Sequence, residues 1–141
     1  MTRRESFVGL KATVLAAEMA YRRAGIDDPV KQVDIATVHD CFTIAEIMAY
    51  EDLEFCRKGE GGKFAESGET DLGGKIPVNT FGGLKAKGHP LAATGVAMVY
   101  EIVKQLRGAA GELQVELKNY RGLLHNVGGT GHFAYVMVFR R

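Results

Sequence analysis

The chain has 141 residues, 25% of them charged, and a formal net charge of +1, so one domain over residues 1–141 with a sizeable buried core is expected. This charge balance excludes nucleic-acid binding through a bulk positive field, and no apolar run reaches the roughly 20 residues that span a membrane. The amino terminus carries charges where a signal peptide has its apolar stretch, which favours a cytoplasmic protein.

The first half of the chain predicts a helix, a strand and a second helix. Apolar residues recur every three or four positions over residues 7–24, and Gly25 stops this pattern as a C-terminal cap would. Residues 33–38 form a short run rich in branched side chains, which is typical of a buried strand. A capping box that begins at Thr43 opens a helix over residues 43–57.

The middle of the chain predicts a loop, a strand and a third helix. Residues 58–75 carry many glycines and charges without periodicity, which indicates a long surface loop. Residues 76–81 have the composition of a strand. Pro90 stands at a favoured first position of a helix, which is predicted to span residues 90–106 and to stop at Gly108.

The end of the chain predicts two strands joined by a glycine-rich turn, over residues 122–126 and 133–139. Residues 112–118 alternate polar and apolar side chains, which fits either a half-exposed strand or an extended connector. Strands that alternate with helices predict an α/β fold with a mostly parallel sheet, helices on both faces and an antiparallel end.

Polar clusters follow three of the predicted strands. They contain His39, Asp40 and Cys41 after the first strand, Gly88 and His89 after the second, and His125 and Asn126 at the end of the third. Because ligands of open α/β sheets bind beyond the carboxyl ends of the strands, we expect these clusters to meet in one crevice.

Each of these residues also has a purely structural interpretation. Cys41 lies just before a helix start, a position that favours thiol reactivity, but a single cysteine is more often a buried structural thiol. His89 precedes a helix start, where a neutral ring can donate one hydrogen bond or simply cap the helix. Cys56 is interpreted as structural, and neither thiol lies in a CxxC motif, so we expect two free thiols and no metal site.

Three motifs together resemble the carboxyl-terminal half of thiolases. They are "HDCF" at residues 39–42, "GGLKAKGHPLAATG" at residues 82–95 and "HNVGGTG" at residues 125–131. The chain is most similar to the sterol-carrier-protein-type and archaeal acetyl-CoA acetyltransferase branch of this family, and the resemblance covers nearly its whole length. It implies a thiolase-like half, with coenzyme A thioesters as substrates and no further cofactor.

The resemblance also implies roles for the clustered residues. His89 corresponds to the histidine that helps bind the thioester oxygen, and His39 stands where many thiolases have an asparagine that supports the oxyanion hole through a water. Cys41 resembles the acid/base that moves a proton at the α-carbon, because Asn126 occupies the place of the later cysteine that does this in many thiolases. Asp40 is expected to be structural.

Glycines near these residues allow the backbone to approach a ligand closely. We therefore expect Gly83, Gly88 and Gly128, together with Asn126, to contact the substrate. The sequence "NVGGTG" loosely matches a dinucleotide-binding pattern, but it precedes a strand and does not open a helix, so that interpretation is rejected.

The family's nucleophilic cysteine belongs to an amino-terminal half whose motif this chain does not contain. We therefore expect a fragment or one subunit of a split enzyme, inactive alone, that binds acyl-CoA and associates with an amino-terminal thiolase half or with itself. Two alternatives stay open: half of a thiolase-like carbon–carbon lyase (aldolase) on coenzyme A thioesters, and a non-catalytic module that binds coenzyme A or lipid or serves assembly.

Overall fold

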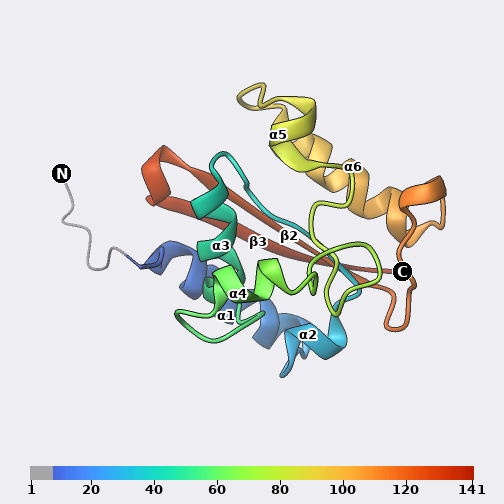
Figure 1. Ribbon diagram of the computed structural model, residues 1–141, viewed down its shortest axis with the longest axis horizontal. Coiled ribbons are helices and arrows are strands. Elements are labelled where there is room, and N and C mark those ends of the chain that lie inside the picture. The colour runs from blue at the N-terminus through green and yellow to red at the C-terminus, as the bar shows by residue number, and fades with distance from the viewer. Residues whose placement is uncertain (1–7) are drawn as a thin grey trace.

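A mixed sheet of three strands forms the centre of the fold (Figure 1). The computed structural model describes residues 8–141. β1 (Ile35–Thr37) pairs in parallel with β2 (Arg121–Gly128), which pairs antiparallel with β3 (Phe133–Arg140). A single parallel bridge from Ala36 to Val78 extends the sheet beyond β1. The predicted α/β class and the antiparallel end are confirmed.

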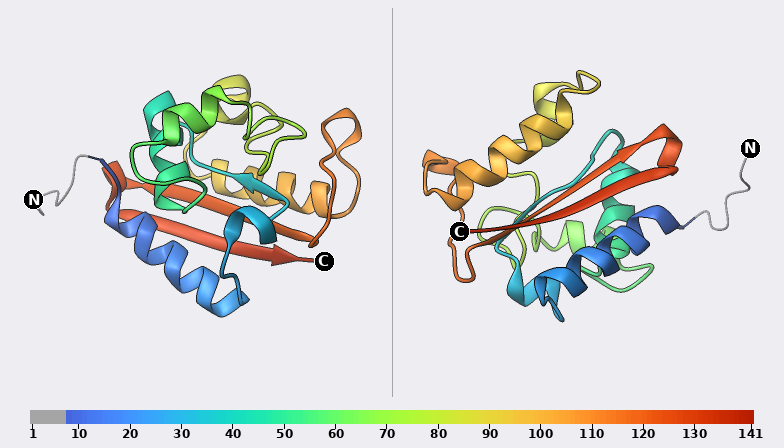
Figure 2. Two further views of the ribbon diagram at one scale, coloured as in Figure 1. Left: turned by 60° about the horizontal axis from the view of Figure 1, so that its bottom comes forward. Right: turned by 180° about the vertical axis from the view of Figure 1, so that it is seen from behind.

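Helices cover both faces of this sheet, as predicted. α1 (Lys11–Ala24) and α3 (Thr43–Asp52) pack on one face, where Ala17, Tyr21 and Leu53 join one buried cluster. α6 (Thr94–Leu106) packs on the other face. Figure 2 shows α1 and α6 on opposite sides of the β2–β3 hairpin.

Several short helices complete the fold. They are α2 (Pro29–Gln32), α4 (Gly61–Glu66), α5 (Gly83–Lys87) and two 3₁₀ turns at Gly111–Leu113 and Gly129–Gly131. Among residues 8–141, no helix is both long enough and apolar enough to cross a membrane.

The ends of the first two predicted helices differ from the sequence patterns. α1 ends at Gly25 in the left-handed conformation, as predicted, but begins at Lys11; the predicted start at Phe7 lies outside the described residues. α3 ends at Asp52, five residues before the predicted end. Glu54 there has a positive φ of 60°, and the turn buries Leu53 and Phe55 on either side. Burial of two large side chains outweighs the roughly 1–2 kcal/mol of a left-handed residue.

The middle of the chain also differs from its predicted elements. The expected loop over residues 58–75 contains α4, whose Phe64 ring lies 6.0 Å from that of Tyr50 in an edge-to-face contact. The expected strand over residues 76–81 contributes only the bridge at Val78. Asn79 has a positive φ of 50°, and its side-chain amide bonds both the N–H and the carbonyl of Val38. Beyond the bridge, at Val38, a side chain thus replaces the backbone ladder.

The third predicted helix starts four residues late. Ala92 has a φ of 67°, which no helical residue adopts, so α6 begins at Thr94. The turn before it is held by the Ala93 and Thr94 N–H groups, which both donate to the carbonyl of Pro90. Pro90 therefore starts a turn and not the helix.

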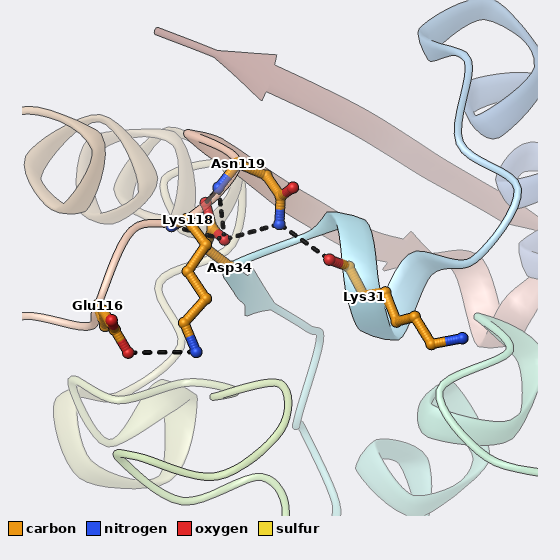
Figure 3. A network of polar contacts seen from close by, with 5 residues as sticks. All are labelled: Lys31, Asp34, Glu116, Lys118 and Asn119. Atoms are coloured by element: carbon orange, nitrogen blue, oxygen red, sulfur yellow. Dashed lines mark hydrogen bonds and ion pairs between the residues drawn. The ribbon is translucent and has the colours of Figure 1, made fainter.

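A buried carboxylate fixes the connector that leads into β2 (Figure 3). Asp34 accepts hydrogen bonds from the backbone N–H groups of Lys118, Asn119 and Arg121, and Asn119 also donates its side-chain amide to Asp34 and to the Lys31 carbonyl. Glu112 and Leu113 lie in the 3₁₀ turn at Gly111–Leu113, and residues 114–118 contain no strand. Of the two predicted alternatives, the extended connector is therefore found, over residues 114–118. These bonds set where β2 begins beside β1.

Candidate active site

The three polar clusters meet at one end of the sheet, as the motif positions predicted. His39 follows β1, Asn126 lies in β2, and His89 precedes α6. All three line a cavity of about 1340 Å³, and Cys41 and Gly128 line it too. Apolar side chains of α3, α6 and β3 form much of the remaining wall, among them Ala45, Met48, Val96, Val99, Tyr135 and Met137.

His39 is held from two sides. Its Nδ1 lies 2.7 Å from Oδ1 of Asn126. Its ring centroid lies 5.0 Å from that of His89 in an edge-to-face arrangement. Burial lowers the pKa of His39, which the hydrogen bond to Asn126 partly opposes, while the His89 ring adds to the lowering. The neutral imidazole is therefore the favoured form at neutral pH.

His89 is anchored by the first residue of the following helix. Its Nδ1 lies 2.7 Å from the hydroxyl oxygen of Thr94, which also donates to the Pro90 carbonyl at 3.3 Å. This threonine is a residue that the sequence reasoning missed. No local pattern marked it, because the sequence placed the helix start at Pro90 and Thr94 inside the helix.

The two cysteines have different surroundings, and both are free. Cys41 is exposed and lines the cavity just before α3. Cys56 is half-buried beyond the end of α3, packs against the core and does not line the cavity. Burial raises the pKa of the Cys56 thiol to about 11, with Glu51 and Glu60 adding to the effect. Of the two thiols, Cys41 is the one placed for chemistry in the cavity.

Asp40 points away from the cavity, into the fold. It is buried, and both of its oxygens accept a hydrogen bond from the Leu84 N–H, at 2.9 and 3.1 Å. Gly83 lies against it: a Cβ there would come within 2.2 Å of the carboxylate, and φ is +61°. Gly128 lines the cavity, whereas Gly83 and Gly88 do not. The predicted contacts of all three glycines with a substrate stay predictions.

A further buried histidine borders the cavity. His125 is 2% exposed, and its Nε2 lies 3.0 Å from the hydroxyl oxygen of Thr13 on α1. Burial lowers its pKa to about 3, and His39 adds to the lowering. The sequence placed His125 in a cluster, but nothing in it indicated Thr13, which is 112 residues away.

Comparison with known proteins identifies the family. A family profile described as "Thiolase C-terminal domain-like" matches residues 1–141. The chain belongs to this thiolase family.

No group of three or more His, Cys, Asp or Glu side chains suited to a metal ion occurs in the part of the chain that the structure describes.

Relatives of this thiolase domain include longer proteins. The chain is 50% identical over 138 residues to an acetyl-CoA acetyltransferase of Methanothermobacter thermautotrophicus, covering 98% of this chain and 35% of that protein. It is 41% identical over 124 residues to sterol carrier protein 2 of Bos taurus, covering 88% of this chain and 22% of that protein. The thiolase domain therefore spans about a third of the length of the first relative and less than a quarter of the second.

A solved structure shares the fold. A chain of the "Ltp2-ChsH2(DUF35) aldolase" aligns with 99% of this thiolase domain and 34% of its own length, with a TM-score of 0.80 and 23% sequence identity. At this identity the likeness shows the fold alone. The fold and the branch of the thiolase family that the three motifs indicated are both confirmed.

Proposed function

We propose that this chain supplies the acid/base half of a thiolase active site that acts on coenzyme A thioesters. The observation that carries the proposal is the meeting of His39, His89 and Cys41 in one cavity, from segments far apart in the sequence. His39, through a water, and His89 bind the thioester oxygen as negative charge develops on it. Cys41 moves the proton at the α-carbon, in Claisen condensation or in thiolysis.

The proposed roles agree with the chemistry that the reaction requires. A proton beside a thioester carbonyl is only weakly acidic, so the enolate oxygen must be stabilised as it forms. A preformed hydrogen-bond donor is worth about 3 kcal/mol in such a site. Cys41 is exposed in the cavity and hence within reach of a substrate there, whereas Cys56 is not. An exposed thiol can exchange a proton with a substrate.

Apolar surface supports association with a partner. α6 buries Met98 and Ile102 but leaves Val96 71% and Tyr100 61% exposed, and Leu91 just before it is 82% exposed. Covering several hundred Å² of such surface contributes on the order of 10 kcal/mol before the costs of association. We propose that an amino-terminal thiolase half, or a second copy of this chain, covers this side of α6.

Sedimentation equilibrium tests the association. At micromolar concentration we expect this chain alone to form dimers through the α6 surface. A Val96→Glu variant should shift it toward monomer, while a matched Glu101→Gln variant on the same helix, whose side chain is 18% exposed, should not. A well-folded wild-type monomer near 15.3 kDa would show that the chain does not associate with itself.

Complementation tests the catalytic proposal. The chain alone should not turn over acetoacetyl-CoA. Among the described residues, Cys41 is the only cysteine that lines the cavity, and its proposed role is proton transfer and not nucleophilic attack. Mixing or co-expression with the amino-terminal half of the archaeal relative should restore thiolysis. Cys41→Ala and His89→Ala should then lower kcat by about 100-fold or more. Turnover by the chain alone would contradict the proposal.

The same experiment separates the alternatives. A thiolase forms a covalent acyl-enzyme on the complementary half, which mass spectrometry detects as an added acyl mass. An aldolase that cleaves a carbon–carbon bond of a coenzyme A thioester needs no such adduct. A binding or assembly module would show no turnover with any complementary half and no loss on changing Cys41.

A further inference from the structure

The hydrogen bonds around Asn126 fix which way its amide group faces. The backbone N–H of Val127 lies 3.1 Å from Oδ1 of Asn126. A backbone N–H only donates, so the atom that it meets must be the amide oxygen. The amide nitrogen faces Gly95 in α6, where a Cβ would come within 3.0 Å of it. The lack of a side chain at Gly95 leaves room for this orientation.

The fixed amide in turn determines the tautomer of His39. The same Oδ1 lies 2.7 Å from Nδ1 of His39. Because an amide oxygen only accepts, Nδ1 must carry the hydrogen. The neutral ring has one N–H, so Nε2 carries the lone pair. No residue within 8–141 makes a hydrogen bond to Nε2, and the ring borders the cavity.

An equivalent arrangement holds His89. The hydroxyl of Thr94 has one hydrogen, and the Pro90 carbonyl at 3.3 Å can only accept it. The threonine oxygen is then the acceptor for Nδ1 of His89 at 2.7 Å. With the hydroxyl hydrogen directed at the Pro90 carbonyl, His89 also carries its hydrogen on Nδ1 when its ring is neutral.

We propose that Asn126 and Thr94 are positioning residues that hold His39 and His89 in the same Nδ1–H tautomer, which leaves both Nε2 lone pairs for the cavity. When both rings are neutral, the pair starts as two acceptors. His39 accepts a hydrogen from a water whose other hydrogen bonds the thioester oxygen. His89 takes a proton onto Nε2 from the nucleophilic cysteine thiol that the amino-terminal half would supply, which leaves a thiolate on that cysteine, and only then donates an N–H to the thioester oxygen.

This reading of the chemistry rests on the proposed function, but the tautomers do not. Long-range proton–nitrogen correlation NMR on chain labelled with ¹⁵N-histidine distinguishes protonated from unprotonated ring nitrogens directly, without substrate. His39→Gln and His89→Gln variants serve to assign the signals. We expect the Nδ1–H tautomer to dominate at both rings by at least about tenfold, the equivalent of one good hydrogen bond.

Matched variants test the two positioning residues. Asn126→Leu should release His39 toward the Nε2–H tautomer, whereas Asn126→Asp keeps an acceptor, preserves Nδ1–H and raises the pKa of His39 through its charge. Thr94→Val should release His89, and Thr94→Ser should not. A general structural effect would move the leucine and aspartate variants together and would leave the tautomer ratio unchanged.

The wild-type spectrum alone can overturn the proposal. An Nε2–H tautomer at His39 would show that the Asn126 amide faces the other way, and the same result at His89 would remove the role of Thr94. Retention of Nδ1–H in Asn126→Leu or Thr94→Val would show that the tautomer has another cause. Failure of thiolysis in the complementation experiment, with both tautomers as expected, would instead refute the proposed function.

Discussion

The two ends of β1 carry buried polar side chains that are used in opposite ways. Asp34 before the strand and His39 after it are each 7% exposed, so burial does not distinguish them. The Asp34 carboxylate receives four donors, three from Lys118 and Asn119 (Figure 3) and one from the Arg121 N–H at the start of β2. His39 has one ring nitrogen bonded to Asn126 and the other free of partners among residues 8–141.

The difference between Asp34 and His39 lies in whether each polar atom already has a hydrogen-bond partner within the protein. Burying a polar group is unfavourable unless it is hydrogen-bonded, so a fully bonded carboxylate holds the chain together and has nothing left for a ligand. A buried ring with one open nitrogen beside a cavity keeps a site for a ligand. Asp40, although it is the neighbour of His39, also bonds within the fold, because both of its oxygens accept the Leu84 N–H.

The largest expected effect comes from removing the Asp34 carboxylate, at the hydrogen-bonded end of β1. Asp34→Ala leaves several buried donors without an acceptor, at about 1–3 kcal/mol each. We therefore expect the free energy of unfolding to fall by at least about 3 kcal/mol, measured by urea denaturation. Asp34→Asn keeps one acceptor oxygen and should lose less.

His39, at the other end of β1, provides the comparison for the Asp34→Ala experiment. His39→Gln removes a ring with one protein hydrogen bond and should change the free energy of unfolding by less than about 1 kcal/mol. Equal losses for Asp34→Ala and His39→Gln would mean that the two ends of β1 do not differ in the way described.

The next effect is a loss of stability in acid caused by His125, which borders the same cavity as His39. The pKa of His125 is lowered by burial to about 3, whereas the unfolded chain takes up a proton near pH 6.5. Below that pH the unfolded state binds a proton that the native state does not, so stability falls as pH drops toward 3. Between pH 7.5 and pH 5 the loss should be about 2 kcal/mol.

A variant isolates this contribution. His125→Gln should flatten the stability profile between pH 7.5 and pH 5, leaving the smaller slope from His39, whose pKa is lowered too. An unchanged slope would show that His125 does not stay neutral in the folded state. Parallel urea titrations at each pH supply the measurement.

The smallest expected effect compares the two thiols. At pH 7.5 the raised pKa of Cys56, about 11, leaves fewer than about one thiolate in a thousand molecules. Iodoacetamide should therefore label the exposed Cys41 at least about tenfold faster, as followed by mass spectrometry. Cys41→Ser and Cys56→Ser give the separate rates, and similar rates would argue against a special place for Cys41.

The sequence was informative where function places chemical groups at strand ends. The motifs around His39, His89 and Asn126 predicted that these residues meet, and the cavity between them confirms it. Helical periodicity predicted α1, the capping box at Thr43 predicted α3, and Pro90 predicted a helix that overlaps α6. These features are local patterns, so they can be read from neighbouring residues.

Other features could not be read in this way because they depend on distant partners. Asn79 ends the expected strand with a positive φ, and what stabilises it is the backbone of Val38, 41 residues away. The left-handed Ala92 delays α6, and no local pattern marks it. Thr13 has no motif of its own and gains meaning only beside His125.

The bond between Asn126 and His39 has a consequence for how the protein folds. These residues are 87 positions apart, and the parallel pairing of β1 with β2 must close that loop before the bond can form. Closing long loops slows folding, because chain entropy is lost before contacts are gained. The histidine pair should therefore assemble late, after α1 and α6 have formed. In stopped-flow NMR refolding, the native resonances of the two histidine rings should appear in the slowest phase.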